Sequence, residues 1–479
     1  MDTVTRMKLL AKDEVQAALK TIQLAARKVL PEGSFGLREE ATLALLEEAA
    51  RVVLQQELST IAASFGDRIL VDGVEYKRHE PGSGQYASLN GPLNLPRDTY
   101  RKVGERNGPT VVPLELVAGL VEGATPAMAY NVADGYAQRD MRQHGHALEL
   151  AHRLPPPRAT LERMAKRIAL AVHEAAPRVE RVLRRGELVP DGARGISIGL
   201  DRTSVPMAEE RPAGAPSEPK RPRRTPRVRI APIPIDVNFR MAYVGTVSFV
   251  NEDGDALVTR RYAAPASDDP TTLVARMTAD VEAAVKRDAT LSVGCVQDGA
   301  PEMWNLTRDG LSGLKTRGII SNWQEGIDRY HLLERLGKAL EIVEPNSAAR
   351  TRQLNDWNVL LDERDSAIDT IEDELTEACL SLDDTRQDDL MEHLIYLQNN
   401  KDRMRYVTLA SACLPIGSGV TESAAKIVVG QRAKNSGQRW REPGLRGALT
   451  LRAIGRSDRL PRFWNRFSRQ YNAIVQQAA

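Results

Sequence analysis

The feature that most constrains the fold is the order of elements between residues 195 and 298, where strand-like segments surround one helical segment. Residues 195–201 alternate apolar with small or polar side chains, which is typical of a strand. Two later apolar segments flank 251–255, a sequence typical of a hairpin turn. We expect strands at 195–201, 240–250, 256–262 and 291–298, a helix at 271–287, and then a short strand near 318–321 and a helix at 330–342. This order predicts a core of mixed α/β type.

Two of the expected strands end at a carboxylate. Asp201 ends the first strand, and Asp298 ends the strand that precedes Gly299-Ala300-Pro301, where a helix is expected to begin. Ligands of α/β sheets collect beyond the carboxyl ends of the strands. The two carboxylates therefore converge if their strands are neighbours.

A third carboxylate, Glu422, lies in the first turn of an expected helix, directly after the glycine-rich loop 415–419. Mg²⁺ usually takes one or two protein carboxylates and shares its other positions with water and phosphate oxygens. Three acids can thus hold two ions about 4 Å apart for in-line phosphoryl displacement. Asp201, Asp298 and Glu422 are therefore candidate catalytic residues and candidate ligands of Mg²⁺ or Mn²⁺.

The order Asp, Asp, Glu and the sequence around each acid resemble the DDE transposases of bacterial insertion sequences. The resemblance is to the Kra-type group and, more distantly, to the Mutator-like enzymes, and it covers roughly residues 190–455. The matching segments are 200–207, 297–301, 328–331 and 422–440. The resemblance implies a ribonuclease-H-like catalytic core with a helical insertion. It also implies metal-dependent endonuclease cleavage at the ends of a transposable element, followed by strand transfer.

Asp328 and His331 resemble the Asp-x-x-His element that Mutator-like transposases carry after their second acid. Helical spacing puts both side chains on one face. A histidine there would act on the scissile phosphate or orient an acidic neighbour. The alternative is a structural hydrogen-bonded pair.

The segment from Lys426 to Arg469 holds twelve Lys or Arg residues and two acids. Cations that neutralise phosphates give sequence-independent affinity for nucleic acid. Trp440 and Trp304 could stack on bases, with core packing as the alternative for both. The candidate DNA contacts in this segment are Lys426, Arg432, Lys434, Arg439 and Trp440. By contrast, residues 362–392 hold thirteen acids and two arginines, and we expect them to repel DNA.

The other regions are predicted from periodicity and composition. Residues 1–66 are expected to be helical, and an apolar stripe from Leu43 to Leu58 indicates either packing or self-association. We expect a homodimer or higher oligomer on DNA. Related transposases place paired cysteines within the region matching 67–113, but none occurs there, so no zinc is expected. The predicted organisation begins with a helical region 1–66, a small β region 67–113 and a helical region 114–190, which is either a DNA-binding region or a plain helical bundle. A core 191–344 with a mobile Pro/Arg arm 208–235, a helical insertion 345–410, and core completion with a basic tail at 411–479 follow.

The composition indicates in which compartment the protein is expected to act. No apolar run of about 18 residues occurs, so no membrane span is expected. The first residues lack an apolar signal-peptide segment, and three separated cysteines fit a reducing compartment. We expect a cytoplasmic, nucleoid-associated bacterial protein whose partner is double-stranded DNA, both element ends and target. Two alternatives stay open: a two-metal DNA nuclease without strand transfer, and a non-catalytic DNA-binding regulator.

Overall fold

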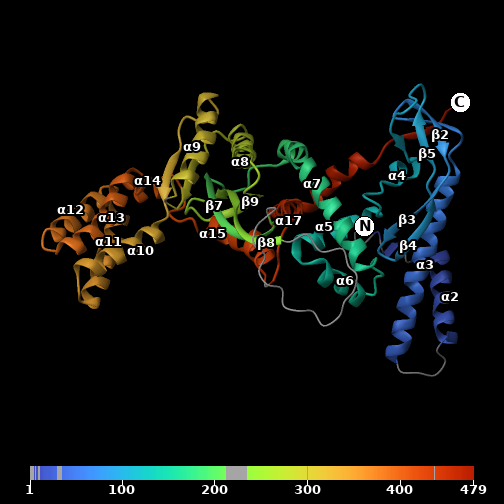
Figure 1. The fold of residues 1–479 in the computed structure, drawn as a ribbon, viewed down its shortest axis with the longest axis horizontal. Helices are drawn as coiled ribbons and strands as arrows, with labels where there is room; N and C mark the ends of the chain where they lie inside the picture. The colour runs from blue at the N-terminus through green and yellow to red at the C-terminus, as the bar shows by residue number, and fades with distance from the viewer. Residues whose placement is uncertain are drawn as a thin grey trace. The chain divides into compact units, whose positions relative to one another are not determined.

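The structure, a computed structural model, shows a mixed α+β protein whose chain divides into two compact units (Figure 1). One unit is Met1–Ala171 with Trp464–Ala479, and the other is Val172–Phe463. None of the helices in the described part of the chain is long and apolar enough to cross a membrane. The described residues are 5, 7–8, 11–29, 35–211, 235–298, 300–435 and 437–478.

The first unit contains a five-stranded antiparallel sheet, in the order β12-β1-β2-β5-β6, and a separate hairpin of β3 and β4. Strand β12 comes from the C-terminal end of the chain and pairs with β1, so this sheet joins segments from both ends of the sequence. The predicted β region 67–113 is thereby confirmed. The strands are β1 (Arg68–Val71), β2 (Val74–Glu80), β3 (Ser83–Ser88), β4 (Gly91–Pro96), β5 (Thr99–Lys102), β6 (Thr110–Val111) and β12 (Val475–Gln477).

Helices surround these strands. The C-terminal end of α3 packs on the apolar core below the β3–β4 hairpin through Leu58 and Ile61. Further toward its N-terminus the apolar stripe is not buried, and Val53 is 63% exposed. The two predicted N-terminal helices are confirmed. The helices are α2 (Asp13–Val29), α3 (Phe35–Ala63), α4 (Pro113–Ala118), α5 (Pro126–Gln138), α6 (Met141–Leu150) and the first part of α7 (Arg158–Gly186), which continues into the second unit.

The second unit is built on a five-stranded sheet in the order β11-β10-β7-β8-β9. Strand β8 is antiparallel to both of its neighbours, whereas β10 is parallel to β7 and β11 is parallel to β10. The predicted hairpin and the order of three strands, a helix and a strand are confirmed. The strands are β7 (Gly195–Glu210), β8 (Ile235–Val250), β9 (Ala256–Pro265), β10 (Ser292–Gln297) and β11 (Gln324–Ile327).

Two predictions about this sheet are corrected. The short strand expected at 318–321 is wrong, since Gly318 has a left-handed φ of 68° and the strand forms later, at β11. The predicted arm 208–235 begins too early, because β7 and β8 remain paired as far as Glu210 and Ile235. Residues 212–234, which make up most of that arm, lie outside the described residues.

Helices complete the second unit (Figure 1). A continuous apolar core connects the sheet with α10 to α14. The prediction that 345–410 is helical is confirmed, with no strand there. The helices are α8 (Pro270–Val285), α9 (Pro301–Thr316), α10 (Arg329–Val343), α11 (Ser347–Glu363), α12 (Ala367–Cys379), α13 (Asp384–Asn400), the 3₁₀ turn η1 (Lys401–Arg403), α14 (Tyr406–Ser411), α15 (Gly419–Ala424), the π-helix η2 (Ala425–Gly430), α16 (Gln431–Ala433), α17 (Glu442–Gly455) and α18 (Leu460–Phe467), which continues into the first unit.

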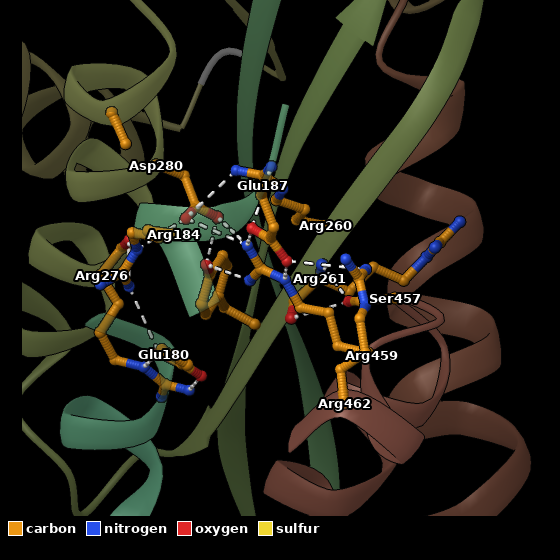
Figure 2. A network of polar contacts seen from close by, with 12 residues as sticks. Glu180, Arg184, Glu187, Arg260, Arg261, Arg276, Asp280, Ser457, Arg459 and Arg462 are labelled. Carbon is orange, nitrogen blue, oxygen red and sulfur yellow. Dashed lines mark hydrogen bonds and ion pairs between the residues drawn. The ribbon is translucent and has the colours of Figure 1, made fainter. Parts of the chain in front are cut away.

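A network of buried ion pairs holds α7, α8, β9 and the segment after α17 together (Figure 2). Asp280 is fully buried; Arg184 Nε donates to its Oδ1 at 2.7 Å, and guanidinium nitrogens of Arg260 and Arg459 lie 3.3 and 3.2 Å from the same oxygen. Burial alone would raise the pKa of Asp280, but Arg459, Arg260 and Arg184 together lower it. Two further acids in the network pair with arginines: Glu187 with Arg260, Arg459 and Arg462, and Glu180 with Arg184 and Arg276.

Candidate functional site

Strands β7 and β10 bring Asp201 and Asp298 to the same level of the sheet. Their parallel pairing extends to Ile198 opposite Cys295. The same register, if continued three residues along both strands, would set Asp201 opposite Asp298. The expectation that Asp201 ends a strand is wrong, since β7 continues to Glu210 with β8 as its neighbour. What ends near Asp201 is the pairing with β10. The two carboxylates thus lie where two parallel strands separate, as expected for a site at the carboxyl edge of such strands.

Helix α15 brings Glu422 to this edge through a close contact with β7. The hydroxyl oxygens of Thr421 and Thr246 lie 2.7 Å apart, and both residues are buried. A Cβ atom on Gly199 would lie only 2.0 Å from Thr421 Oγ1. Glycine is therefore required at 199 for the helix to approach the strand this closely. Glu422 follows Thr421 directly, so this contact fixes its position relative to Asp201.

Asp328 connects the start of α10 with the start of α15. It is the N-cap of α10 and accepts a hydrogen bond from the His331 amide at 2.9 Å. Its other oxygen accepts from the Ser418 amide and lies 2.8 Å from Ser418 Oγ. Burial would raise the pKa of Asp328, but these hydrogen bonds lower it, so the carboxylate is held ionised.

Ser418 is a site residue that the sequence analysis did not single out. Its Oγ lies 2.8 Å from Asp328 and 3.0 Å from Glu422 Oε1. A hydroxyl has one proton, so it can donate to only one of these carboxylates at a time. The signal for it was its position immediately before the helix that carries Glu422, where an N-cap serine is common.

His331 completes a cluster with Asp328 and Glu422. Its Nδ1 lies 3.3 Å from Asp328 Oδ1 and 3.6 Å from Glu422 Oε1, and its side chain is partly exposed. One potential ligand atom from each residue lies within 4.8 Å of the others, close enough to hold a metal ion. The predicted pairing of Asp328 with His331 is therefore present, and Glu422 joins it.

Electrostatics connects this cluster with the two aspartates. Burial raises the pKa of Asp201; a hydrogen bond from the Arg202 amide opposes this, and the negative charges of Asp298 and Glu422 raise it further. Asp298 accepts a hydrogen bond from the Ala300 amide at 3.2 Å. Among the described residues, no lysine or arginine forms an ion pair with Asp201, Asp298, Asp328 or Glu422. In the described part of the chain, the cluster close enough to share an ion is thus Asp328, His331 and Glu422. Asp201 and Asp298 lie outside that cluster, although the charges of Asp298 and Glu422 act on Asp201.

The predicted DNA contacts do not all lie on the surface. Lys426, Lys434 and Arg439 are exposed. Arg432 is 2% exposed, and its guanidinium lies 4.6 Å from the centre of the Trp440 ring. Trp440 is buried as well and donates from Nε1 to the Ala433 carbonyl at 3.2 Å. The assignment of Arg432 and Trp440 to surface contact is corrected, because both are enclosed.

The remaining tryptophan candidate and part of the basic tail are also internal. Trp304 is buried, with the Arg403 guanidinium 4.6 Å from its ring centre, which is the packing alternative. Arg452 and Arg459 from the tail are buried too, and Arg459 belongs to the ion-pair network (Figure 2). The basic excess of the tail is thus partly neutralised inside the protein.

No protein-family model matches this chain, and no curated protein was found to be similar to it.

Proposed function

We propose that this protein is a DDE transposase with a ribonuclease-H-like core, which cleaves DNA at insertion-sequence ends and transfers the strands to a target. The sheet order β11-β10-β7-β8-β9 supports such a core. In this sheet β11, β10 and β7 are parallel, and β8 is antiparallel to β7. The helical segment between β11 and α15 also supports such a core, because it lies at the position in the sequence where the inserted domain is expected. Function rests on the site rather than on the fold.

The observation that supports the proposal is that the charges of Asp298 and Glu422 act on Asp201, while no lysine or arginine among the described residues forms an ion pair with any of the three. Burial raises the pKa of Asp201, and repulsion from the carboxylates of Asp298 and Glu422 raises it further. Hard oxygen ligands suit Mg²⁺ and Mn²⁺. Asp201, Asp298 and Glu422 would hold such ions, which supply charge stabilisation for the attacking and leaving oxygens of the phosphodiester.

The chain's own residues would prepare this site. Asp328 fixes the His331 amide and the start of α15, so it sets where Glu422 and the imidazole lie. His331, beside Glu422 and partly exposed, would exchange a proton with the nucleophile or the leaving oxygen. The exposed cations Lys426, Lys434 and Arg439 would contact the phosphates of duplex DNA.

Strand transfer also requires two DNA ends to be held together. The apolar residues of α3 that lie away from the core, among them Val53 and Leu54, support self-association as a dimer or higher oligomer. The proposal therefore includes an oligomer acting on double-stranded DNA in the bacterial cytoplasm.

The test is a gel assay with the purified full-length protein, Mg²⁺ or Mn²⁺, linear DNA carrying the sequences that flank the gene, and a target plasmid. We expect cleavage and joined products, both lost by about a hundredfold or more in Asp201→Asn, Asp298→Asn and Glu422→Gln, since even outer-shell partners of a metal are worth about 10- to 100-fold. Asp373→Asn, an exposed acid in α12, is the matched control.

The outcomes separate three functions. Joined products that need all three acids support the transposase. Metal-dependent nicking without any joined product identifies the nuclease instead. Tight DNA binding with no cleavage in either metal identifies the non-catalytic regulator.

A further inference from the structure

A cavity of about 630 Å³ lies in the first unit, between the β3–β4 hairpin and the first turns of α7. Its volume falls within the range of about 300–1,000 Å³ that is usual for small-molecule sites. All of its lining residues belong to the first unit. Residues of the hairpin, the segment 154–157 and α7 line it.

One side of this cavity carries cations. Arg163, Lys166 and Arg167 are spaced as i, i+3 and i+4 on α7, so they share one face of the helix, and all three are exposed. Arg167 donates to the Glu122 carbonyl at 2.8 Å and lies 3.6 Å from its carboxylate. Glu122 is the one acid in the lining, so its charge is offset by Arg167. The cavity therefore has a net positive charge.

The two other cations are available to a ligand. Arg163 makes only a long contact, 3.5 Å, with Thr160 Oγ1. Lys166 forms no ion pair with a described residue. Their shared helix face places two positive groups about one helical turn apart at the cavity wall. This spacing suits an extended anion whose charged groups are joined along a backbone. A single small anion would need far less space than the cavity provides.

Another part of the lining is apolar. Leu154 is 50% exposed, and Pro155, Pro156 and Pro157 continue the surface beside it. Met164 of α7 also lines the cavity. Flat apolar surfaces and a polarisable sulfur suit a planar ring. Gln85 and Thr160 add hydrogen-bonding groups to the lining.

We propose that this cavity binds an unpaired nucleotide of a DNA strand. Its base would lie against Leu154 and the adjacent prolines, and its phosphates would contact Arg163 and Lys166. Duplex DNA keeps its bases stacked and could not fill the apolar wall, so the site would distinguish a strand with an unpaired end from a blunt duplex. The inference rests on the proposed function only in taking DNA as the partner.

The test measures binding in EDTA, where no metal-dependent cleavage occurs, so it does not depend on catalysis. The probes are a duplex with a three-nucleotide 3′ overhang that contains 2-aminopurine, the same duplex with a blunt end, and inorganic phosphate as a competitor. Anisotropy reports affinity, and 2-aminopurine fluorescence reports the surroundings of the unpaired base.

We expect the wild-type protein to prefer the overhang by about fivefold or more, the value of one base held against a protein surface. Arg163→Ala/Lys166→Ala should lower the slope of log K against log salt for the overhang by about 1.4, which is about 0.7 for each lost contact with a single strand. Leu154→Asp should abolish the preference and the fluorescence change. The matched control is Lys77→Ala/Arg106→Ala, which removes two exposed charges of the same unit that do not line the cavity.

Equal binding of overhang and blunt duplex by the wild type would overturn the proposal. So would an unchanged salt slope in the double variant, or competition by phosphate alone at the overhang's affinity. If the overhang preference is present but the metal-dependent assay yields no cleavage, the nucleotide site stands and the transposase assignment fails. Circular dichroism of each variant excludes unfolding as the cause.

Discussion

The second unit contains two clusters of acids with opposite surroundings. In the buried network, Asp280, Glu187 and Glu180 each contact at least two arginine guanidinium groups (Figure 2). In the candidate site, Asp201, Asp298 and Glu422 have no lysine or arginine partner among the described residues, and His331 lies 3.6 Å from Glu422. The same kind of side chain is thus neutralised from within the fold in one place and left without compensation in the other.

This difference indicates what each cluster is for. A buried charge is tolerated only when it is paired and hydrogen-bonded, and the arginines satisfy that need around Asp280. Acids crowded at an open edge without such partners raise the free energy of the folded state. Such an arrangement is expected where a cation from solution is to bind, because perturbed acids concentrate at functional sites.

The largest effect is expected from breaking the buried network. Asp280→Asn leaves the surrounding guanidinium groups without their shared anion, and removal of one partner of a buried pair destabilises by about 3–5 kcal/mol. The measurement is the urea-induced unfolding transition at neutral pH, with Asp373→Asn as the exposed control. A loss of stability no greater than the control's would show that the network is not needed for folding.

The carboxylate of Asp280 also makes the stability of the folded state depend on pH. The folded-state pKa of Asp280 is lowered, so its stabilising contribution is present above the unfolded-state pKa of about 3.9 and is lost as pH falls through the lower folded value. We therefore expect the stability difference between wild type and Asp280→Asn to be constant near neutral pH and to shrink below about pH 4.

A smaller effect is expected from the contact that places Glu422. Gly199→Ala inserts a methyl group where Thr421 Oγ1 would lie 2.0 Å away, and overpacking of this kind destabilises by about 1–3 kcal/mol. It should also weaken Mg²⁺ binding, measured by isothermal titration calorimetry, because α15 must move away from β7. Adding Thr421→Ala removes the obstructing hydroxyl and should restore part of both losses, as coupled neighbours do. Independent, additive effects of the two substitutions would contradict this role of Gly199.

The sequence allowed much of this architecture to be predicted, for local reasons. The hairpin, β10 and the helices around them were found because their apolar periodicity and turn residues are continuous in the chain. Asp298 and Glu422 were found because they stand beside a strand end and a helix start, and Asp201 was found because it ends the apolar alternation of 195–201. The true length of β7 was missed because polar residues and Pro206 interrupt the apolar pattern after Asp201, and their pairing with β8 is a tertiary contact.

Other features depend on contacts between distant residues. Arg432 was expected on the surface, but the π-helix η2 precedes it and offsets the helix face, and the guanidinium lies against Trp440. The buried network pairs Arg459 with Glu187 and Asp280, which are far from it in the sequence. No periodicity in one sequence marks such pairs, because a buried arginine and an exposed arginine occupy similar positions in a helical pattern.

The smallest effect should have the opposite sign from that at Asp280. The folded-state pKa of Asp201 is raised, by burial and by its neighbouring carboxylates, so the ionised form opposes folding at neutral pH. Asp201→Asn in EDTA should therefore raise stability, by about 1 kcal/mol, a gain often seen when a functional group is removed. The advantage should disappear below about pH 4, where the wild-type carboxylate is protonated in both states.

In Mg²⁺ at a hundred times its Kd, the wild type should gain about 2.7 kcal/mol of stability and the variant much less, so that their order of stability reverses. Thermal unfolding with EDTA and with Mg²⁺ measures both signs, and a variant that is less stable than the wild type in EDTA would place Asp201 with the structural acids of the buried network.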